Sequence, residues 1–537
     1  ILALSTLLSQ LLGLFRDRLL AGTFGAGEML DVYYSAFRVQ DFIFYVVASL
    51  LSLAVLIPLV SEALEEGGRE KAKRLLNSLL TITFVLVGAF TLLAFLSAPL
   101  LARWLFPGII ENGSEKILVE LMRLLLLSPF FFSFSGLLAS VTQIYNRFYL
   151  TAIQPVLYNI GIIFGIVFLY PSFGLKGVVF GVLIGAFAHM AVQIPFVAKL
   201  GLMPYPTLAI SWSDIKRVGL LSVYRGTALG INQIVLLFLT GYATTIAVGA
   251  VSVMTFAQNI QSIPLALVGA SYSVATFPVL SRIFSKGDFE AFINQIGNIT
   301  RHIIFWSLPM AVLFIVLRAQ IVRVVLGAGL FDWNDTRLTA ACLALFVVSV
   351  AFQGLSLLYV RGFYAAGRNR EALLIGVVSA LFTVIFAYAG TYIFNHYDSF
   401  RYFIEHLLRV ENLPGSAVLI LPLAFSVGSI INAALFIIFF KRAFSISSIG
   451  LNETIFHSFS ASVLMGFVTY QFLDYFGTLF NLHTFIGIFL QGLLSGVLGI
   501  LAGVVLLYML KNREFLETAE ALRRRFAREE IISPQDL

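Results

Sequence analysis

The chain has 537 residues, of which 59% are hydrophobic and 12% are charged, and its mean hydropathy is +0.94. This composition excludes a compact water-soluble protein, because too few polar side chains remain to cover its surface. The formal net charge of +7 needs no nucleic-acid partner, since basic connections between membrane spans account for it. The sequence lacks a Gly-x-x-x-x-Gly-Lys-Ser/Thr phosphate loop, so an ATP-driven pump would need a separate subunit.

Apolar runs long enough to cross a bilayer as a helix recur along the whole chain. They predict an all-α integral membrane protein with about fourteen transmembrane helices, because backbone polar groups in lipid must be satisfied internally. In chain order we expect these spans at 1–21, 29–63, 76–106, 117–145, 150–170, 175–198, 215–243, 250–284, 299–326, 338–364, 372–394, 417–440, 455–476 and 485–510.

Connections rich in Lys and Arg alternate with connections that are poor in them. The poor set holds only Lys116, Lys176, Arg337, Arg401 and Arg409. By the positive-inside rule, the rich connections and both chain termini are cytoplasmic. The tail "KNREFLETAEALRRRFAREE" predicts an amphipathic helix whose apolar face carries Phe515, Ala519, Leu522 and Phe526. Such a helix suits an anionic inner leaflet, and a solvated tail explains the same pattern equally well.

The chain contains an internal duplication. Identical residues recur at one constant offset of 220 positions in the pairs Pro58 and Pro278, Ser61 and Ser281, Gly67 and Gly287, and Glu70 and Glu290. Each copy covers about six helices, so the copies should form two pseudo-symmetric lobes around a central cavity, with alternating access. We expect an N-lobe at 1–200, a C-lobe at 201–442, two further helices at 443–511 and a cytoplasmic amphipathic tail at 512–537.

A polar stripe runs along the second predicted span, in "DVYYSAFRVQDF". Asp31, Tyr34, Arg38 and Asp41 are spaced so that they share one helix face. A charge at the bilayer centre costs at least about 2.5–3.5 kcal/mol, so these side chains should face a wet interior or a partner. An ion-pair stripe that only fastens two helices is the alternative interpretation.

Arg16 and Asp17 in the first span point about 100° apart, so one of them should face a polar interior. Arg18, Arg103, Arg318 and Arg323 lie near helix ends, from where long side chains reach the headgroups. The second copy carries amides where the first carries charges, and the offset matches Arg38 with Gln258.

An arginine-lined cavity suits a phosphate-bearing lipid substrate, because the guanidinium fork matches phosphate oxygens. The predicted substrate-binding residues are Arg16, Asp17, Asp31, Arg38, Arg225, Asn232, Gln258 and Asn259. The lone cysteine Cys342 and six scattered histidines show no metal-ligand spacing, so we expect no metal and no cofactor.

Several stretches resemble, in order and spacing, the MurJ/MviN family of lipid II flippases. They include "SQLLGLFRDRLLAGTFGAGEMLDVYYSAFRV", "YNRFYLTAIQPVLYNI", "LGAGLFDWNDTRLTAACLALF" and "RGFYAAGRNREAL". The resemblance implies the fold of the multidrug/oligosaccharidyl-lipid/polysaccharide exporters, with residues 443–511 forming a groove for an undecaprenyl tail.

It also implies a transporter and not an enzyme. Such a protein moves the undecaprenyl-pyrophosphate-linked peptidoglycan precursor, lipid II, from the inner to the outer leaflet of the bacterial cytoplasmic membrane by alternating access. The membrane potential or an ion gradient would drive it. The expected partners are lipid II and membrane lipids, and we expect a monomer without nucleic acid.

The chain departs from the family pattern where the resemblance implies arginines that hold pyrophosphate. It has Gln10, Phe44, Tyr45 and Asn259 at those positions. Either Arg16, Arg38 and Arg225 replace them, or the chain is a flippase for another polyprenyl-linked oligosaccharide of the O-antigen type. The seventh and eleventh predicted spans of this chain also lack the carboxylates that would match the family's sodium site. A drug or cation antiporter would instead carry an acid-lined second lobe, and a scaffold of a cell-envelope complex would not transport at all.

Overall fold

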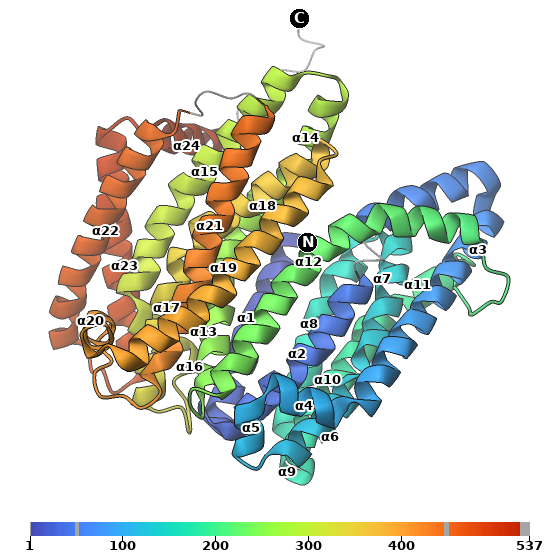
Figure 1. The fold of residues 1–537 in the computed structure, drawn as a ribbon. Helices are drawn as coiled ribbons and strands as arrows, with labels where there is room; N and C mark the ends of the chain where they lie inside the picture. The colour runs from blue at the N-terminus through green and yellow to red at the C-terminus, as the bar shows by residue number, and fades with distance from the viewer. Residues whose placement is uncertain (1, 49–52, 445–449, 527–537) are drawn as a thin grey trace, which may run out of the picture. The chain divides into compact units, whose positions relative to one another are not determined.

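In the computed structural model, residues 2–48, 53–444 and 450–526 are described, and this part of the chain is helical and contains no strand (Figure 1). The helices divide into two units. The first comprises Ile1–Ile260, Val325–Leu345 and Asn369–Gly428, and the second comprises Gln261–Val324, Phe346–Arg368 and Ser429–Leu537. The all-α membrane fold predicted from the sequence is confirmed, whereas the division into lobes at residues 200 and 442 stays a prediction.

The first unit begins with the helices that carry the predicted polar residues. They are α1 (Leu2–Phe24), α2 (Glu28–Ala48), α3 (Leu53–Leu96), α4 (Ala98–Leu105), α5 (Pro107–Glu111), α6 (Glu115–Leu125), α7 (Ser128–Ile144), α8 (Phe148–Phe164), η1 (Gly165–Leu169), α9 (Tyr170–Phe173), α10 (Leu175–Ala191), α11 (Ile194–Lys199) and α12 (Trp212–Thr244). Later segments of this unit lie in α13 (Ala250–Pro264), α17 (Trp333–Val348), α19 (Asn369–His396), α20 (Asp398–Leu408), η3 (Ser416–Leu419) and α21 (Ile420–Ala443).

The second unit contains the remaining helices, except the last two residues of α16, together with the ends of α13, α17 and α21. They are η2 (Leu265–Ala270), α14 (Ser271–Ser285), α15 (Phe289–Val316), α16 (Arg318–Leu326), α18 (Val350–Ala365), α22 (Asn452–Leu479), α23 (Phe485–Met509) and α24 (Arg513–Phe526). In this unit α22 packs along α23 and also along α15, as Figure 1 shows.

Nine helices of the described residues are long and apolar enough to cross a membrane, and α17 with α18, bent by 41°, makes a tenth if the pair is one span. The chain is therefore a multi-pass membrane protein, and the expected count of fourteen spans stays a prediction. Helices α1 and α2 are also long, at 23 and 21 residues, but each carries three or more charged side chains. Four of the eight predicted substrate-binding residues, Arg16, Asp17, Asp31 and Arg38, lie on these two helices.

The predicted connection between the spans at 29–63 and 76–106 is shorter in the structure than in the sequence pattern. Two helical segments, together labelled α3, meet at a non-helical kink formed by Gly67 and Gly68. Gly68 has a φ of 60° and a ψ of −157°, which other residues adopt at a steric cost. Two glycines therefore make the reversal that the pattern assigned to a loop. Residues 49–52, inside the predicted second span, lie outside the described part of the chain.

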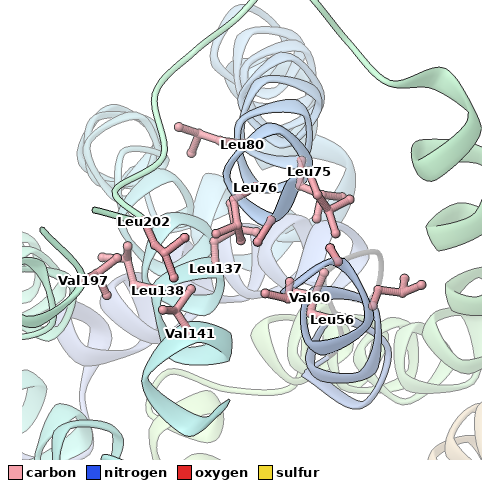
Figure 2. Close-up of a cluster of buried hydrophobic side chains, with 14 of the residues drawn as sticks. Leu56, Val60, Leu75, Leu76, Leu80, Leu137, Leu138, Val141, Val197 and Leu202 are labelled. Carbon is pink, nitrogen blue, oxygen red and sulfur yellow. The ribbon is translucent and has the colours of Figure 1, made fainter. Parts of the chain in front are cut away.

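A cluster of buried leucines and valines holds α3 against α7 in the first unit (Figure 2). Leu56, Val60 and Leu76 of α3 meet Leu137 and Leu138 of α7, all with less than a tenth of their surface exposed. Burying such side chains contributes about 1.5–3 kcal/mol each in water, although in lipid close packing replaces the hydrophobic effect. This cluster fixes the helices that surround the polar residues of α2.

Helices α8 and α10 approach each other through glycines. A Cβ on Gly161 would lie 2.3 Å from Gly185 Cα, and a Cβ on Gly181 would lie 2.5 Å from the Gly165 Cα. Glycines spaced four residues apart let two helix backbones touch in a membrane, where lipid tails offer no hydrophobic gain for helix association. The sequence shows this spacing in "GIIFG" and "GVVFGVLIG".

The start of α24 is docked on the second unit. Phe515 packs against the cluster of Phe305, Ala461 and Leu507, and buried Glu514 accepts a hydrogen bond from Thr454 Oγ1 at 2.7 Å. Arg513 donates from Nε to Glu517 Oε1 at 2.8 Å and thereby lowers the pKa of Glu517. The predicted amphipathic helix thus exists, with its first apolar residue turned to the protein, while the side chains of Leu522 and Phe526 lie outside the described residues.

We expect Gly181→Val to destabilise the protein, because its side chain would clash with backbone atoms of α8 that cannot rotate away. Overpacking of this kind costs about 1–3 kcal/mol. The matched control is Gly88→Val, since a Cβ on Gly88 of α3 meets nothing within 4 Å. Thermal unfolding in detergent, followed by intrinsic fluorescence, should give a lower Tm for the first variant only. Equal melting temperatures for the two variants would contradict a glycine-dependent contact between α8 and α10.

Candidate functional site

Arg16 is held in place by two partners from different helices. It donates from Nε and Nη2 to Asp17 Oδ1, at 2.9 and 2.7 Å, and from Nη1 to Asn159 Oδ1 of α8 at 3.1 Å. The Asp17 side chain is 3% exposed and the Arg16 side chain 21%. The two charges in α1 therefore compensate each other, and the guanidinium is the part that other molecules can reach.

Asp17 has a second partner on α13. Its Oδ2 accepts a hydrogen bond from Asn259 Nδ2 at 2.9 Å. Asn259 is one of the positions where the resemblance implied an arginine. A neutral amide at this position satisfies the carboxylate oxygen without adding a charge, so Arg16 is the one cation that bonds Asp17 within the described contacts.

Asp31 caps the start of α13. Its Oδ2 accepts from the Gly249 backbone N–H at 2.6 Å, and its Oδ1 accepts from the Ser252 N–H at 2.8 Å and from Ser252 Oγ at 2.5 Å. The first turn of a helix exposes unpaired N–H groups and a positive dipole end, which a carboxylate satisfies. Asp31 is 3% exposed, so its oxygens are engaged by the protein in this conformation.

Gly249 makes this cap possible. Its φ is +86°, and a Cβ there would lie 2.2 Å from the carbonyl oxygen of Ala26, in the turn between α1 and α2. The same turn is tied down from the other side, because Asp335 Oδ2 accepts from the Ala26 N–H at 3.1 Å. The glycine turn therefore joins α1, α2 and the start of α13 closely. Arg18, expected to reach the headgroups, instead donates to the Gly327 carbonyl at 3.2 Å.

Arg38 reaches from α2 to two other helices. It donates from Nε to Thr240 Oγ1 of α12 at 3.0 Å and from Nη2 to Gln258 Oε1 of α13 at 3.2 Å. No direct ion pair joins Arg38 to an acid in the part of the chain that the structure describes. The hydrogen-bond partners of Arg38 are therefore neutral groups of two neighbouring helices.

The Arg38 contact also bears on the duplication. Arg38 and Gln258 are 220 positions apart, which is the offset of the internal repeat, so two equivalent positions meet each other. Equivalent residues meet in this way when two repeats are related by an axis that passes between them.

The structure places the eight predicted site residues in different surroundings. Arg16, Asp17 and Asn259 form one connected cluster, and Arg38 with Gln258 forms a second. Asp31 is a buried cap, and Asn232 lies exposed on α12 apart from these clusters. The side chain of Arg225 lies outside the described residues. Sequence reasoning missed Asn159, Thr240 and Ser252, although Asn159 was visible as an isolated amide inside an apolar span.

The helical architecture has the fold of solved lipid-flippase and multidrug-transporter structures. A solved structure titled lipid II flippase MurJ, inward closed conformation, has a TM-score of 0.72 and 21% identity, covering 98% of this chain and 99% of its own. A multidrug resistance MATE family transporter of the MOP superfamily has a TM-score of 0.66 and 16% identity, covering 82% and 96%. At these identities the likeness shows the fold.

The family follows from sequence. The family model described as lipid II flippase MurJ matches residues 20–491, and the chain belongs to this family. The probable lipid II flippase MurJ of Rhizobium tropici is 26% identical, over 71% of this chain and 74% of its own length. The lipid II flippase MurJ of Burkholderia cenocepacia is 24% identical, over 67% and 71%. The resemblance found in the sequence is confirmed.

We expect Asp31→Asn to lower the stability of the protein by about 0.5–2 kcal/mol, the usual cost of losing a helix cap. The amide keeps one acceptor but removes the charge at the start of α13 and sets an N–H group against backbone N–H groups. The matched control is Asp41→Asn on the same helix, because Asp41 has no hydrogen-bond or ion-pair partner among the described residues. Thermal unfolding in detergent compares the two. A Tm loss for Asp41→Asn as large as that for Asp31→Asn would contradict the capping role.

Proposed function

We propose that this chain moves lipid II from the inner to the outer leaflet of the bacterial cytoplasmic membrane, with Arg16 and Arg38 as its pyrophosphate-binding groups. Membership in the lipid II flippase MurJ family carries the proposal. The contacts of Arg16 support the assignment of the site, because a charge is kept on an apolar helix only where partners or function retain it.

Arg16 is prepared for an anion by its fixed partners. A guanidinium carries five N–H donors, and the bonds to Asp17 and Asn159 use three of them. Two donors remain for phosphate oxygens, and the side chain does not need to be ordered when the lipid arrives, which reduces the entropic cost of binding. Arg38 uses two of its five donors on neutral groups and keeps three for the same anion.

Asp31 serves as a contact that alternating access must make and break. It joins α2, in the first copy of the repeat, to the start of α13, in the second copy. Flippases that alternate between two leaflets need such bistable contacts, and a carboxylate on helix N–H groups separates without leaving an apolar core open. The polar groups that it leaves can be solvated by water.

The finer features expected from the sequence belong to this proposal. They are two six-helix lobes at 1–200 and 201–442, a lipid-tail groove at 443–511, a monomer, and both termini in the cytoplasm. The basic connections and the basic tail support the orientation. Energy would come from the membrane potential or an ion gradient.

A flippase for another polyprenyl-linked oligosaccharide is the second candidate. One observation favours it: Asn259 bonds Asp17 at a place where the resemblance implied a pyrophosphate-binding arginine. The polyprenyl pyrophosphate would be common to both candidates, and only the saccharide would differ.

We expect Arg16→Gln and Arg38→Gln each to lower the flipping rate by about 10-fold to 100-fold, because each removes charge-assisted hydrogen bonds worth about 1.5–3 kcal/mol. Flipping is measured in proteoliposomes as the fraction of labelled lipid II that becomes accessible to an added impermeant enzyme. The matched control is Arg103→Gln, since the Arg103 side chain is 64% exposed and pairs with Glu115 at the surface. A wild-type rate for both test variants would remove these arginines from the mechanism.

Rescue of a bacterium depleted of its own lipid II flippase separates the two candidate substrates. We expect the wild-type chain to restore growth and cell shape, and the Arg16→Gln variant to fail at equal expression. If the wild-type chain is expressed in the membrane and growth does not return, the oligosaccharide candidate takes precedence over lipid II.

A further inference from the structure

A cavity of about 360 Å³ lies inside the first unit, among α2, α7, α8 and α10. Its volume is within the range of about 300–1,000 Å³ that small-molecule sites have. Its lining includes Gln40, Asp41, Phe132, Ser135, Tyr158 and His189. The function proposed above uses none of these side chains.

One hydrogen-bond acceptor that lines this cavity has no hydrogen-bond partner in the described part of the chain. Gln40 also contributes to the wall, but its Oε1 is buried and cannot be reached from the cavity. The Asp41 carboxylate, one residue further along α2, has neither a hydrogen bond nor an ion pair. Its oxygens are therefore available to accept hydrogen bonds from a ligand that donates.

A histidine faces the same space. Ser135 Oγ accepts from Gln193 Nε2 at 2.8 Å and lies 2.9 Å from His189 Nδ1 and 3.3 Å from the His189 carbonyl oxygen, to either of which its hydrogen can go. The cavity therefore offers a carboxylate acceptor from α2 and an imidazole from α10.

Aromatic rings form the apolar part of the wall. Phe132 lies edge-on to Tyr158, with 5.2 Å between ring centroids, and 5.3 Å from Phe44. A Cβ on Gly136, which also lines the cavity, would meet nothing within 4 Å. A flat ligand with one apolar face could therefore pack on these rings and occupy the open space beside Gly136.

We infer that this cavity binds one sugar ring of the lipid-linked substrate. Hydroxyl groups both donate and accept, so they can pair with the Asp41 carboxylate and with His189 in either tautomer, and the C–H face of a pyranose packs on aromatic rings. An ammonium group could only donate, so it would pair with Asp41 alone when the His189 ring nitrogen carries a proton. A phosphate would be repelled by Asp41.

The position in the chain fits the order of groups in such a lipid. Tyr158 of the cavity precedes Asn159, which accepts from Arg16, and Asp41 lies one turn after Arg38. A pyrophosphate at the arginines would therefore carry its attached sugar toward the cavity. The inference rests on the proposed function and identifies the saccharide-binding part of the same site.

The experiment compares three lipids on the full chain in nanodiscs, with binding measured by native mass spectrometry. They are undecaprenyl pyrophosphate, the same lipid with one peptide-bearing N-acetylated sugar, and lipid II. For the wild type we expect both sugar-bearing lipids to bind at least about tenfold more tightly than the bare pyrophosphate.

Gly136→Leu fills the cavity without a change of charge, and Asp41→Asn removes a carboxylate whose charge interacts with Arg38. We expect both to abolish the gain from the sugar. Gly136→Leu should leave binding of the bare pyrophosphate unchanged, and Asp41→Asn should not weaken it. Gly88→Leu, at an open glycine of α3, is the matched control and should keep the full gain.

Three results would overturn the inference. The first is a full sugar gain in Gly136→Leu, and the second is an equal loss for all three lipids. The third is that the wild type loses the gain in affinity when the amine of the lipid's stem peptide is acetylated. The cavity would then bind an ammonium group and not a sugar. A wild type that binds none of the three lipids would instead refute the proposed function, so the two failures are distinguishable.

Discussion

The structure depends on one constraint, which is that the buried charges on α1 and α2 must be satisfied by partners inside the protein. Asp17 is bonded by Arg16 and Asn259, Asp31 by the start of α13, and Arg38 by groups on α12 and α13. Each of these bonds joins two helices or holds a side chain that is bonded to another helix. The charges therefore determine which helices stand together as well as what they can bind.

The meeting of Arg38 with Gln258 shows why a duplicated protein benefits from losing its symmetry. A carboxylate at position 258 would neutralise the guanidinium, whereas an amide satisfies one donor and leaves the positive charge available. Asn259 has the complementary effect on Asp17, because it adds a hydrogen bond without competing with Arg16 for charge. The first copy supplies charge and the second supplies neutral support, as the sequence pattern indicated.

Features with a local signature could be predicted, and those that need a distant partner could not. Helix α8 was expected from residue 150 and begins at Phe148, because an apolar run between turn residues is a local signal. The glycine contact of α8 with α10 was readable in the four-residue spacing but was missed, as was the two-glycine break in α3. The capping role of Asp31 was beyond reach, since it requires knowing that Gly249, 218 positions away, starts a helix beside it.

The Asp31 cap sets the energy scale for transport. Hydrogen bonds to a charged group contribute about 1.5–3 kcal/mol each, so separating Asp31 from its three donors costs several kcal/mol before water replaces them. A ligand shifts a conformational equilibrium only by its difference in affinity between the two states. A pyrophosphate bound by two guanidiniums supplies interactions of this size, provided that Arg16 and Arg38 converge on it in one state only. Arg16 is held by Asp17 and Asn159, so Arg38 is the arginine whose position must change. Arg38 is held by neutral groups on α12 and α13. A phosphate displaces such neutral partners more easily than it displaces a carboxylate.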